Sequence, residues 1–367
     1  MPLDARTLAW ARLVLLQLPA ATIAALLREF GSAQAIFAAS RAQVAAATTV
    51  AAAQKISGRT DEPALDAIRA WLDADHHELV AWDDSDYPQA LFSMPDAPPA
   101  LFFIGRRELL NRPALAIVGS RHATPQGVEN ARNFASTLSQ AGLTIVSGLA
   151  LGIDTAAHEG ALEGEGSTIA CIGTGPDRVY PASNRDLAHT IAKSGAILSE
   201  FIPGTPPLRH NFPRRNRLIS GLARGVLVVE ATLSSGSLIT ARLAAEQGRD
   251  VFAIPGSIHS PFSRGCHRLI RDGAKLVETA QDIIEELRLP GLSSIPVADA
   301  APGSRRSSPT QSPHNEIVAA LGGDPCGLDV LISRTHLEPQ ALTAALIELE
   351  LDGHVAALPG GRWQRVA

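Results

Sequence analysis

The sequence predicts an α/β protein built around an extended, Rossmann-like, doubly wound sheet that is mainly parallel. Between residues 115 and 256, six short apolar runs alternate with segments of helical character. Strands buried on both faces read as continuous apolar runs, and their alternation with helices is typical of a parallel sheet covered on both sides. Helical periodicity before this region, and short helices with a terminal hairpin after it, predict an N-terminal helical domain and a C-terminal winged-helix domain.

Length and composition limit the class of protein. The chain has 367 residues, of which 46% are apolar, so it can bury a sizeable core and is expected to form two or three domains. Asp4, Arg6 and Arg12 interrupt the most apolar N-terminal stretch, so neither a membrane span of about 18 residues nor a signal peptide is indicated. We therefore expect a cytoplasmic protein.

Cysteine usage and net charge limit the class of protein further. Cys171, Cys266 and Cys326 lie far apart without a CxxC pair, which indicates buried, inert thiols and neither a disulfide framework nor a metal site. The formal net charge is −5. Nucleic-acid binding nevertheless needs only one local basic surface, because phosphate attraction decays over about 10 Å. The distribution of charge therefore matters more than its total.

Residues 1–75 predict a small helical domain. They are rich in Ala and Leu at helical spacing, and Gly31 is placed to end one of the helices. The segment LQLPAATIAALLREFGS resembles a helix-hairpin-helix or SAM-like module. The glycines through which such a hairpin approaches DNA are missing between Pro19 and Leu26. We therefore expect this SAM-like domain to pack against the rest of the protein and not to bind DNA.

Residues 76–289 contain the predicted sheet. Thr124 before Pro125 is a good helix start, because its hydroxyl can cap the helix and proline suits the first position, and Gly142 is placed to end this helix. In open parallel sheets, ligands bind beyond the carboxyl ends of the strands. The predicted strands are LAIVGS (115–120), LTIVSG (143–148), TIACIG (168–173), AILSE (196–200), GVLVVEA (225–231) and DVFAIPG (250–256).

The C-terminal part predicts a linker and a winged helix. Residues 290–314 are dense in Pro, Ser, Gly and Ala, which is typical of a flexible linker. Residues 315–367 predict three short helices and a hairpin around Gly360 and Gly361. The third helix carries Glu338, Glu348, Glu350 and Asp352 and no basic residue. Because phosphates would repel this helix, we expect a protein-interaction or regulatory role.

The stretch LRHNFPRRNR, residues 208–217, is locally basic. Between residues 201 and 229 there are five arginines and no Asp or Glu, although acids outnumber bases by 37 to 32 over the chain. An arginine is permanently charged, forks onto phosphate and stacks on bases, and Phe212 adds an aromatic face. Stacking on an aromatic ring stabilises a bound strand by about 1–3 kcal/mol per base, whatever the sequence. This favours binding of single strands over duplex. The alternative for Phe212 is a core position beside Pro213.

Four predicted strand-to-helix loops consist of small residues that let a phosphate approach the backbone. Each loop alone is a weak signal, because such turns also need glycine for structural reasons. Four of them in one sheet, together with an acid-free arginine stretch, favour phosphate binding. The loops are Gly119-Ser120-Arg121, Ser147-Gly148-Leu149-Ala150, Gly173-Thr174-Gly175 and Ser234-Ser235-Gly236-Ser237.

A dinucleotide site and a hydrolytic site are the alternatives for these loops. The fingerprint GxGxxG is not matched, since the first loop reads GSRHATPQG and GTGPDR lacks the third glycine, so no cofactor is expected. Glu230, Asp154 and His158 are acid–base candidates. However, Asp154 can cap the helix after Gly152, and His158 can be a hydrogen-bonded core histidine. We favour these structural roles and expect binding, not catalysis.

Six motifs identify a family resemblance. They are IVGSR (117–121), SGLALGIDTAAHEGAL (147–162), GTGPDRVYP (173–181), FPRRNRLISGL (212–222), VVEATLSSGSLITARLAAEQGRDVFAIPG (228–256) and GCHRLIRDGAKLV (265–277). Together they resemble the DNA-processing protein A family, DprA, also called Smf, over most of residues 80–289. The resemblance implies a single-stranded DNA-binding protein of naturally transformable bacteria that protects incoming strands and loads the RecA recombinase. It also implies a Rossmann-like core, a homodimer built from that core, and no cofactor.

The resemblance assigns residues to the expected DNA site. It implies that Arg121 is the arginine of the GSR motif, that Arg209 is the basic residue three before the aromatic Phe212, and that Arg214 and Arg217 belong to the FPxRNR stretch. Pro176 departs from the family, which has an aliphatic residue there. We expect the phosphates to lie along the strand-carboxyl edge, held by these four arginines and by the N–H groups of Ser120, Gly148, Gly173 and Gly236, while Phe212 stacks a base.

The dimer surface and two other functions complete the expectations. In GCHRLIRDGAKLV, His267 and Ile270 share a helix face that leads to Leu276 and Val277, so this segment is the candidate dimer surface, with simple core packing as the alternative. The second function is that of a nucleotide phosphoribohydrolase of the lysine-decarboxylase-like group. The pattern PGGxGTxxE of that group is poorly matched by SSGSLIT, where Thr240 stands near the position of the glutamate. A winged-helix transcription regulator is the third, and the acidic third helix disfavours it.

Overall fold

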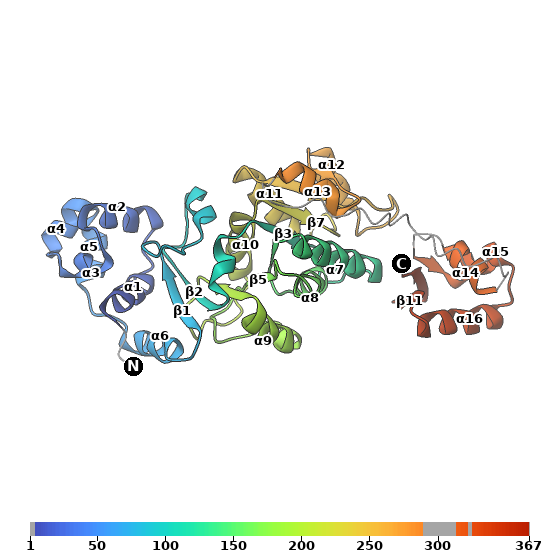
Figure 1. Cartoon of the computed structure of the whole chain (residues 1–367), viewed down its shortest axis with the longest axis horizontal. Coiled ribbons are helices and arrows are strands. Elements are labelled where there is room, and N and C mark those ends of the chain that lie inside the picture. The colour runs from blue at the N-terminus through green and yellow to red at the C-terminus, as the bar shows by residue number, and fades with distance from the viewer. Residues whose placement is uncertain (1–3, 289–312, 322–324, 367) are drawn as a thin grey trace.

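A computed structural model describes residues 4–288, 313–321 and 325–366. The chain runs from a group of N-terminal helices through a large sheet to a C-terminal lobe (Figure 1). The segment expected as a linker, residues 290–314, lies outside the described residues except for 313 and 314, which begin a helix. Within the described ranges, no helix combines the length and apolarity needed to cross a membrane.

The N-terminal segment is helical, as predicted. Its helices are α1 (Ala5–Leu15), α2 (Ala20–Phe30), α3 (Ala33–Ala38), α4 (Arg41–Ala47), α5 (Val50–Ser57) and α6 (Glu62–Leu72). The carboxylate of Asp4 accepts hydrogen bonds from the first amides of α1, and Gly31 ends α2 in the left-handed conformation expected of glycine. Buried residues of these helices form one core with Leu79, Ala81 and Phe102 of the sheet edge. The helical segment therefore packs directly against the sheet.

The central sheet has nine strands in the order β1-β2-β6-β5-β4-β3-β7-β8-β9. Pairing from β6 to β9 is parallel, whereas β1 and β2 join antiparallel at one edge. All six predicted strands are present, and sequence analysis missed β1, β2 and β9. The bounds are β1 His77–Ala81, β2 Ala100–Gly105, β3 Ala114–Val118, β4 Thr144–Ser147, β5 Thr168–Cys171, β6 Ala196–Ser199, β7 Gly225–Val228, β8 Asp250–Ala253 and β9 Lys275–Leu276.

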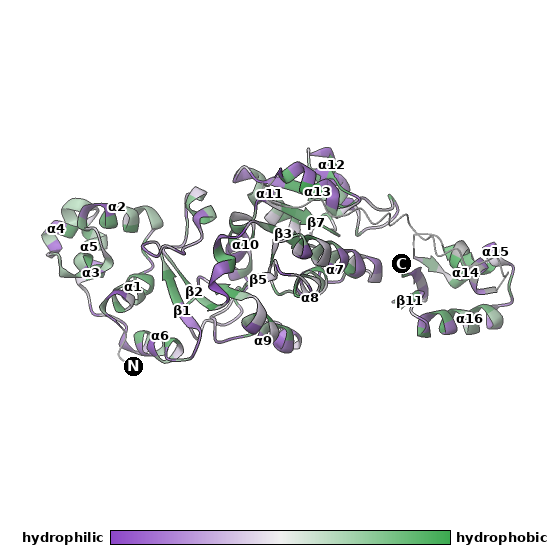
Figure 2. Ribbon diagram, in the orientation of Figure 1, coloured by the Kyte–Doolittle hydropathy of each residue, from purple (hydrophilic) through white to green (hydrophobic). Residues whose placement is uncertain are grey.

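Helices cover both faces of this sheet, as a doubly wound fold requires. One buried cluster joins the sheet to α7, α8 and α13, and another joins its opposite face to α10 and α11. The central strands, such as β3 and β7, are correspondingly apolar (Figure 2). The helices are α7 (Pro125–Gln140), α8 (Ile153–Ala161), α9 (Arg185–Ser194), α10 (Asn211–Leu222), α11 (Ser237–Glu246), α12 (Arg264–Arg271) and α13 (Ala280–Leu287), with short 3-10 helices at Gln89–Ser93, Arg107–Asn111 and Ala182–Asn184.

Two local predictions for the sheet region are confirmed. Thr124 Oγ1 accepts a hydrogen bond from the Gly127 amide at 3.0 Å, so it caps α7, and Gly142 follows the end of that helix at a φ of 97°. Cys171, Cys266 and Cys326 are buried, as expected. Burial raises the pKa of Cys171 and of Cys266 to about 12, so both thiols stay protonated.

The direction of the chain changes in the middle of the sheet. From β3 the chain proceeds to β4, β5 and β6 on one side, and from β7 it proceeds to β8 and β9 on the other. The loops that leave β3 and β7 therefore diverge, and a crevice forms between the carboxyl ends of these neighbouring strands. This is the position at which open α/β sheets bind their ligands.

The C-terminal lobe is the predicted winged helix. It contains α14 (Pro313–Leu321), β10 (Cys326–Gly327), α15 (Leu328–Thr335), α16 (Pro339–Leu351), β11 (Val355–Leu358) and β12 (Arg362–Arg365), with the strand order β10-β12-β11. Gly360 and Gly361 turn the β11–β12 hairpin with φ of 85° and 67°, which suits glycine at both positions. Leu331, Leu346 and Trp363 belong to a core of its own.

Candidate functional site

A cavity of about 780 Å³ and another of about 720 Å³ border helix α10, and the second lies at the divergence of the β3 and β7 loops. We call this second cavity the switch-point crevice. Side chains from the β3 loop, from the segment before α10 and from the start of α11 line it. The lining includes Ser120, Arg121, Tyr180, Arg209, Phe212, Arg215 and Gly236.

The β3 loop is held by hydrogen bonds and close packing, and it presents one arginine. The carbonyl of Ser120 accepts a hydrogen bond from the Ile153 amide at 3.2 Å, and its hydroxyl accepts one from the His122 amide at 3.1 Å. A Cβ atom on Gly119 would lie 2.6 Å from Ile153, so only glycine allows this close approach. Arg121 is exposed at the tip, with its guanidinium carbon 5.7 Å from the centre of the Phe212 ring.

Asp154 binds backbone amides of the β4 loop. This corrects the expectation that it caps α8. Asp154 Oδ2 accepts hydrogen bonds from the amides of Gly148 at 3.1 Å and Ala150 at 3.3 Å. Gly152, and not Asp154, occupies the N-cap position of α8. The Gly148 amide is therefore already bound and is not free for a phosphate, because its hydrogen points at a buried carboxylate.

His158 is a core histidine, as favoured from the sequence. Its Nε2 accepts a hydrogen bond from the Leu149 amide at 3.2 Å, and Nδ1 lies 2.7 Å from the Thr168 hydroxyl. Burial lowers the pKa of His158 to about 3, because the charged ring would lose its hydration. The neutral ring thus has both nitrogens occupied and is not placed as an acid–base catalyst.

Arg215 forms the floor of the crevice, a role that sequence analysis missed. Its side chain is buried, and Nη1 donates to the carbonyls of Gly148 and Cys171, the latter at 2.7 Å. Burial lowers its pKa, and the neighbouring Asp154 carboxylate opposes that effect. Because β4 and β5 end at these two carbonyls, Arg215 fixes both strand ends relative to α10. The motif FPxRNR could have singled it out, because Arg214 stands at the variable position and Arg215 is the first arginine of the motif.

Phe212 lies half-buried at the crevice wall and is not a core residue. A Cβ atom on Gly173 would lie 2.9 Å from Phe212 Cδ1, so this glycine makes room for the ring. Gly173 is buried beneath Phe212, which argues against the expected contact between its N–H group and a phosphate. Tyr180, which sequence analysis also missed, has 47% of its surface exposed, with its ring centre 5.5 Å from that of Phe212.

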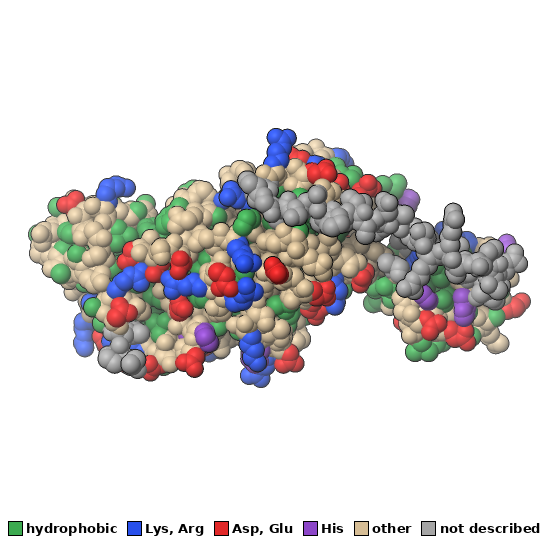
Figure 3. All heavy atoms as spheres, viewed as in Figure 1, with side chains coloured by type: hydrophobic (Ala, Val, Ile, Leu, Met, Phe, Trp, Pro, Cys, Tyr) green, Lys and Arg blue, Asp and Glu red, His purple; other side chains and the backbone are tan. Residues whose placement is uncertain are grey.

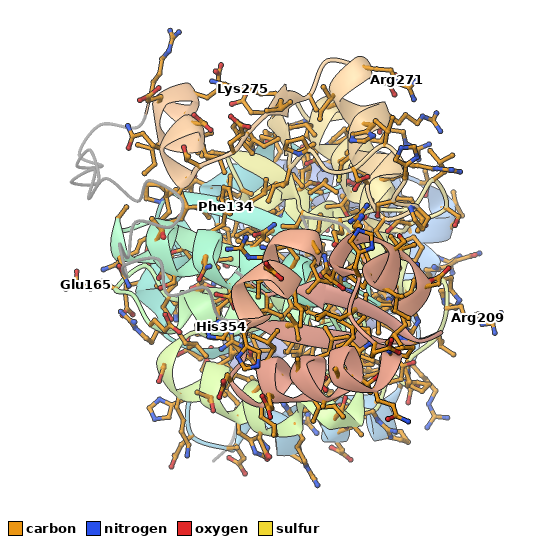
Figure 4. All side chains as sticks on the ribbon, turned by 90° about the vertical axis from the view of Figure 1, so that its right-hand side faces the viewer. Phe134, Glu165, Arg209, Arg271, Lys275 and His354 are labelled. Carbon is orange, nitrogen blue, oxygen red and sulfur yellow. The ribbon has the colours of Figure 1, made fainter. Side chains whose placement is uncertain are left out.

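Arg209 and Gly236 lie at the open side of the crevice. Arg209 is exposed and projects from the surface of the molecule (Figure 4). Among the described residues, neither Arg209 nor Arg121 forms an ion pair. Gly236 is exposed immediately before α11, and the hydroxyls of Ser235 and Ser237 lie 2.7 Å apart beside it. The start of α11 therefore offers small residues and backbone N–H groups at the rim.

Glu230 and Thr240, the other two residues considered for hydrolysis, are hydrogen-bonded or buried. Glu230 accepts hydrogen bonds from the Thr124 amide at 2.9 Å and from its hydroxyl at 2.6 Å, so it supports the cap of α7. Burial raises its pKa, and those two hydrogen bonds oppose the rise. Thr240, near the position where the phosphoribohydrolase pattern has its glutamate, lines the crevice but is 1% exposed and has no carboxylate. No carboxylate free of structural contacts faces the crevice from the described lining residues.

Arg214 and Arg217 are not brought to the switch-point crevice, which corrects the expected line of four arginines. Both lie on the opposite side of α10, where Glu200 binds them: Arg214 Nη2 is 3.1 Å from Glu200 Oε2, and Arg217 Nη2 contacts the same oxygen. Arg217 Nη1 also donates to the Asp96 carbonyl at 2.6 Å. The side chain of Arg217 is 11% exposed and that of Glu200 is 2% exposed. Glu200 directly precedes the acid-free stretch, so a window beginning at residue 201 excluded the partner of these arginines.

The fold and the crevice together define a class of protein. They describe a Rossmann-like protein with an open, arginine-rimmed crevice in place of the dinucleotide fingerprint. The sequence profile of the family described as DNA recombination-mediator protein A matches residues 78–288, and that of the DprA winged helix domain matches residues 300–361. The chain belongs to the DNA recombination-mediator protein A family, as the motifs indicated.

Relatives of known name agree with this membership. Protein Smf of Escherichia coli is 44% identical over 81% of this chain and 80% of its own length. The DNA processing protein DprA of Streptococcus pneumoniae is 52% identical over 55% of this chain and 72% of its own. The X-ray structure of the pneumococcal protein superimposes with a TM-score of 0.68 at 39% identity, covering 78% of this chain and 99% of that one. DNA processing protein A of Helicobacter pylori, described for its single-stranded DNA binding mode, gives 0.53 at 33% identity over 58% of this chain and 97% of that one.

Proposed function

We propose that this protein binds single-stranded DNA without regard to sequence, protects incoming strands and loads the RecA recombinase on them during natural transformation and recombination. Membership of the recombination-mediator family supports the proposal, as does the single-stranded DNA binding described for the Helicobacter pylori relative. The observation that carries it is the grouping of two unpaired, exposed arginines with the half-buried ring of Phe212 and the exposed ring of Tyr180 around one crevice. Cations bind phosphates and aromatic rings stack on bases, so this grouping suits a flexible single strand.

In this proposal Arg121 and Arg209 bind successive phosphates, while Phe212 stacks a base and Tyr180 extends the stacking surface. The backbone near Ser120 and Gly236 allows a phosphate to approach closely, since small residues lie on both sides of the crevice. None of these contacts reads the edge of a base, so binding depends on the backbone and on stacking. Affinity should fall with salt by about 0.7 log unit per log unit for each phosphate neutralised.

We also propose that the protein acts as a homodimer through the surface around α12. A hollow there is lined by Leu233, His267, Ile270 and Leu276, and two of these apolar residues are largely exposed, Leu233 at 54% and Leu276 at 45%. Exposed leucines that cluster in this way are typical of a protein contact surface. Val277, which was expected to belong to this surface, is fully buried in the core and is removed from the proposal.

The proposal favours binding over catalysis. A phosphoribohydrolase would need a free carboxylate in the crevice, whereas Asp154 is bound to backbone amides and Glu230 supports a helix cap. A sequence-specific regulator would place a basic recognition helix in DNA, whereas α16 is acidic at Glu348 and Glu350. Figure 3 shows acidic and basic side chains interspersed on the visible face, which leaves local clusters to direct binding.

Fluorescence anisotropy with labelled oligothymidylates and a matched duplex tests the proposal across a salt series. Wild-type protein is expected to bind the single strand tightly, and Arg121→Ala and Arg209→Ala to bind it more weakly with a smaller salt dependence. Arg28→Ala, an exposed arginine of α2, is the matched control and should bind as wild type does. Failure of the wild type to bind single strands would overturn the proposal.

A further inference from the structure

The larger of the two cavities at α10, of about 780 Å³, has no role in the site described above. It lies between the start of α2 and the outer side of α10, and we call it the α2 pocket. Residues of the N-terminal helices that line it include Leu13, Ala20 and Ile23, and those from the sheet region include Phe201, Asn211 and Arg214. Figure 1 shows the N-terminal helices beside β1 and β2.

Helix α10 and the residues before it form a wall common to both cavities. Arg209 and Phe212 line the switch-point crevice, whereas His210 and Arg214 line the α2 pocket. The crest between the cavities is exposed at Leu208, Arg209 and His210, and no acid occurs in this stretch. A helix is about 10–12 Å across, so a strand of a few nucleotides is long enough to pass from one cavity to the other.

The lining of the α2 pocket suits a nucleotide. Arg214 keeps 58% of its side chain exposed although it contacts Glu200, so its guanidinium remains available to a phosphate. Much of the remaining lining is apolar, as a base face requires. Glu200 Oε1 and Asn211 Nδ2 are buried along this wall without a hydrogen-bond partner in the described part of the chain. One is an acceptor and the other a donor, and every base carries groups of both kinds on its edge.

We propose that the α2 pocket is a second nucleotide site that receives the same DNA strand after it crosses the crest of α10. In this arrangement Arg214 binds a phosphate at the rim, and the base enters between α2 and α10. The proposal rests on the proposed function, because a strand must first occupy the switch-point crevice. It assigns the N-terminal helices a part in binding, although their hairpin lacks the glycines of DNA-binding modules.

Binding of short and long strands separates the two cavities. Oligothymidylates of about 4 and about 16 nucleotides, the limits of typical single-strand site sizes, would fill the crevice alone or both cavities. Arg214→Ala is expected to weaken binding of the long strand about fivefold at 0.1 M salt, the effect of one phosphate contact, and to leave the short strand unchanged. Arg214→Lys should restore the affinity, and Arg28→Ala should not change it.

A second variant fills the pocket without removing a charge. Ala20→Trp, at the start of α2, is expected to weaken long-strand binding by about fivefold or more, the lower end of one stacking contact, again without effect on the short strand. As an independent measurement, long strands carrying 4-thiothymidine should cross-link to peptides from residues 13–23 or 96–100, which line the α2 pocket and not the crevice, and short strands should not. Cross-links confined to the crevice would contradict the proposal.

The outcomes distinguish failure of this inference from failure of the proposed function. If the wild type binds neither strand, the proposed function falls and the second site falls with it. If Arg121→Ala weakens both strands while Arg214→Ala and Ala20→Trp bind both as the wild type does, the function stands and the α2 pocket is not part of the strand path. Equal weakening of both strands by Arg214→Ala would also overturn the inference, because it would place that residue at the crevice.

Discussion

The two sides of helix α10 use arginine in different ways. On the crevice side, Arg209 is exposed and has no acidic partner among the described residues, so its charge is available to a ligand. On the other side, Arg217 is nearly buried against Glu200 and the Asp96 carbonyl. These arginines lie within one short stretch of sequence. The neighbouring acid and the degree of burial, and not the residue type, therefore decide whether a cation stabilises the fold or binds a polyanion.

The strongest test of this contrast is Arg215→Ala at the crevice floor. It removes the donor to the carbonyls of Gly148 and Cys171 and leaves the buried Asp154 without its neighbouring cation. Loss of one partner of a buried charged group costs about 3–5 kcal/mol, so the free energy of unfolding in urea should fall by that amount. Arg209→Ala is the control and should unfold at the wild-type urea concentration. An unchanged midpoint for Arg215→Ala would show that the floor does not depend on this residue.

Low pH should lower the free energy of unfolding through protonation of His158, which lies near the crevice floor. The expected loss is somewhat smaller than that for Arg215→Ala. The folded pKa of His158, about 3, lies below the ordinary value of 6.5, so the unfolded chain binds the proton first. Stability is therefore complete above pH 6.5 and falls by about 1.4 kcal/mol per pH unit below it, or about 3 kcal/mol by pH 4. Urea unfolding from pH 7 to pH 4 measures this loss. His158→Gln should flatten the profile, and an equally steep profile in that variant would assign the effect to other groups.

A pair of substitutions compares the two sides of α10 directly. Arg217→Ala should lower the free energy of unfolding by about 2 kcal/mol, between the values for exposed and buried pairs, because Glu200 loses one of its cations. Its affinity for short single strands should remain near that of the wild type. Arg209→Ala should show the reverse pattern, with weaker binding and unchanged stability. If both variants lose affinity alike at equal stability, the division of roles between the two sides is wrong.

The smallest expected effect concerns the second aromatic ring of the crevice. Tyr180→Ala removes an exposed ring 5.5 Å from Phe212 and should weaken single-strand binding about fivefold, corresponding to about 1 kcal/mol of stacking. Tyr180→Phe keeps the ring and should bind as the wild type does, because stacking does not require the hydroxyl. Anisotropy at constant salt measures both. Wild-type affinity in Tyr180→Ala would limit stacking to Phe212.

Much of the fold was predictable because it depends on local patterns. The six central strands are continuous apolar runs, Thr124 and Pro125 form a helix start, and Gly360 and Gly361 form a hairpin turn. Strand β2, written ALFFIG, was missed although its apolar run was visible in the sequence. Its neighbour β1 is a five-residue edge strand that buries only its later residues, so its pattern is too short to distinguish a strand from a loop.

The candidate site was predictable in part. Arg121, Arg209 and Phe212 meet at one crevice because their segments follow the carboxyl ends of the sheet or border them, which the alternation of strands and helices implies. The roles of Gly148, Arg215 and Tyr180 were not predictable. They depend on which amide faces Asp154, which guanidinium lies under two strand ends and which ring lies beside Phe212.

Patterns in the amino-acid sequence were enough to predict a parallel sheet with small-residue loops at its carboxyl edge, an arginine-rich stretch beside that edge and a terminal winged helix. These features follow from periodicity, turn chemistry and residue type, which are local properties. Which arginines have an acidic partner could be learned only from the folded chain. Ion pairing depends on separations of a few ångströms between Glu200 and the outer side of α10, and burial depends on how that helix packs against the sheet.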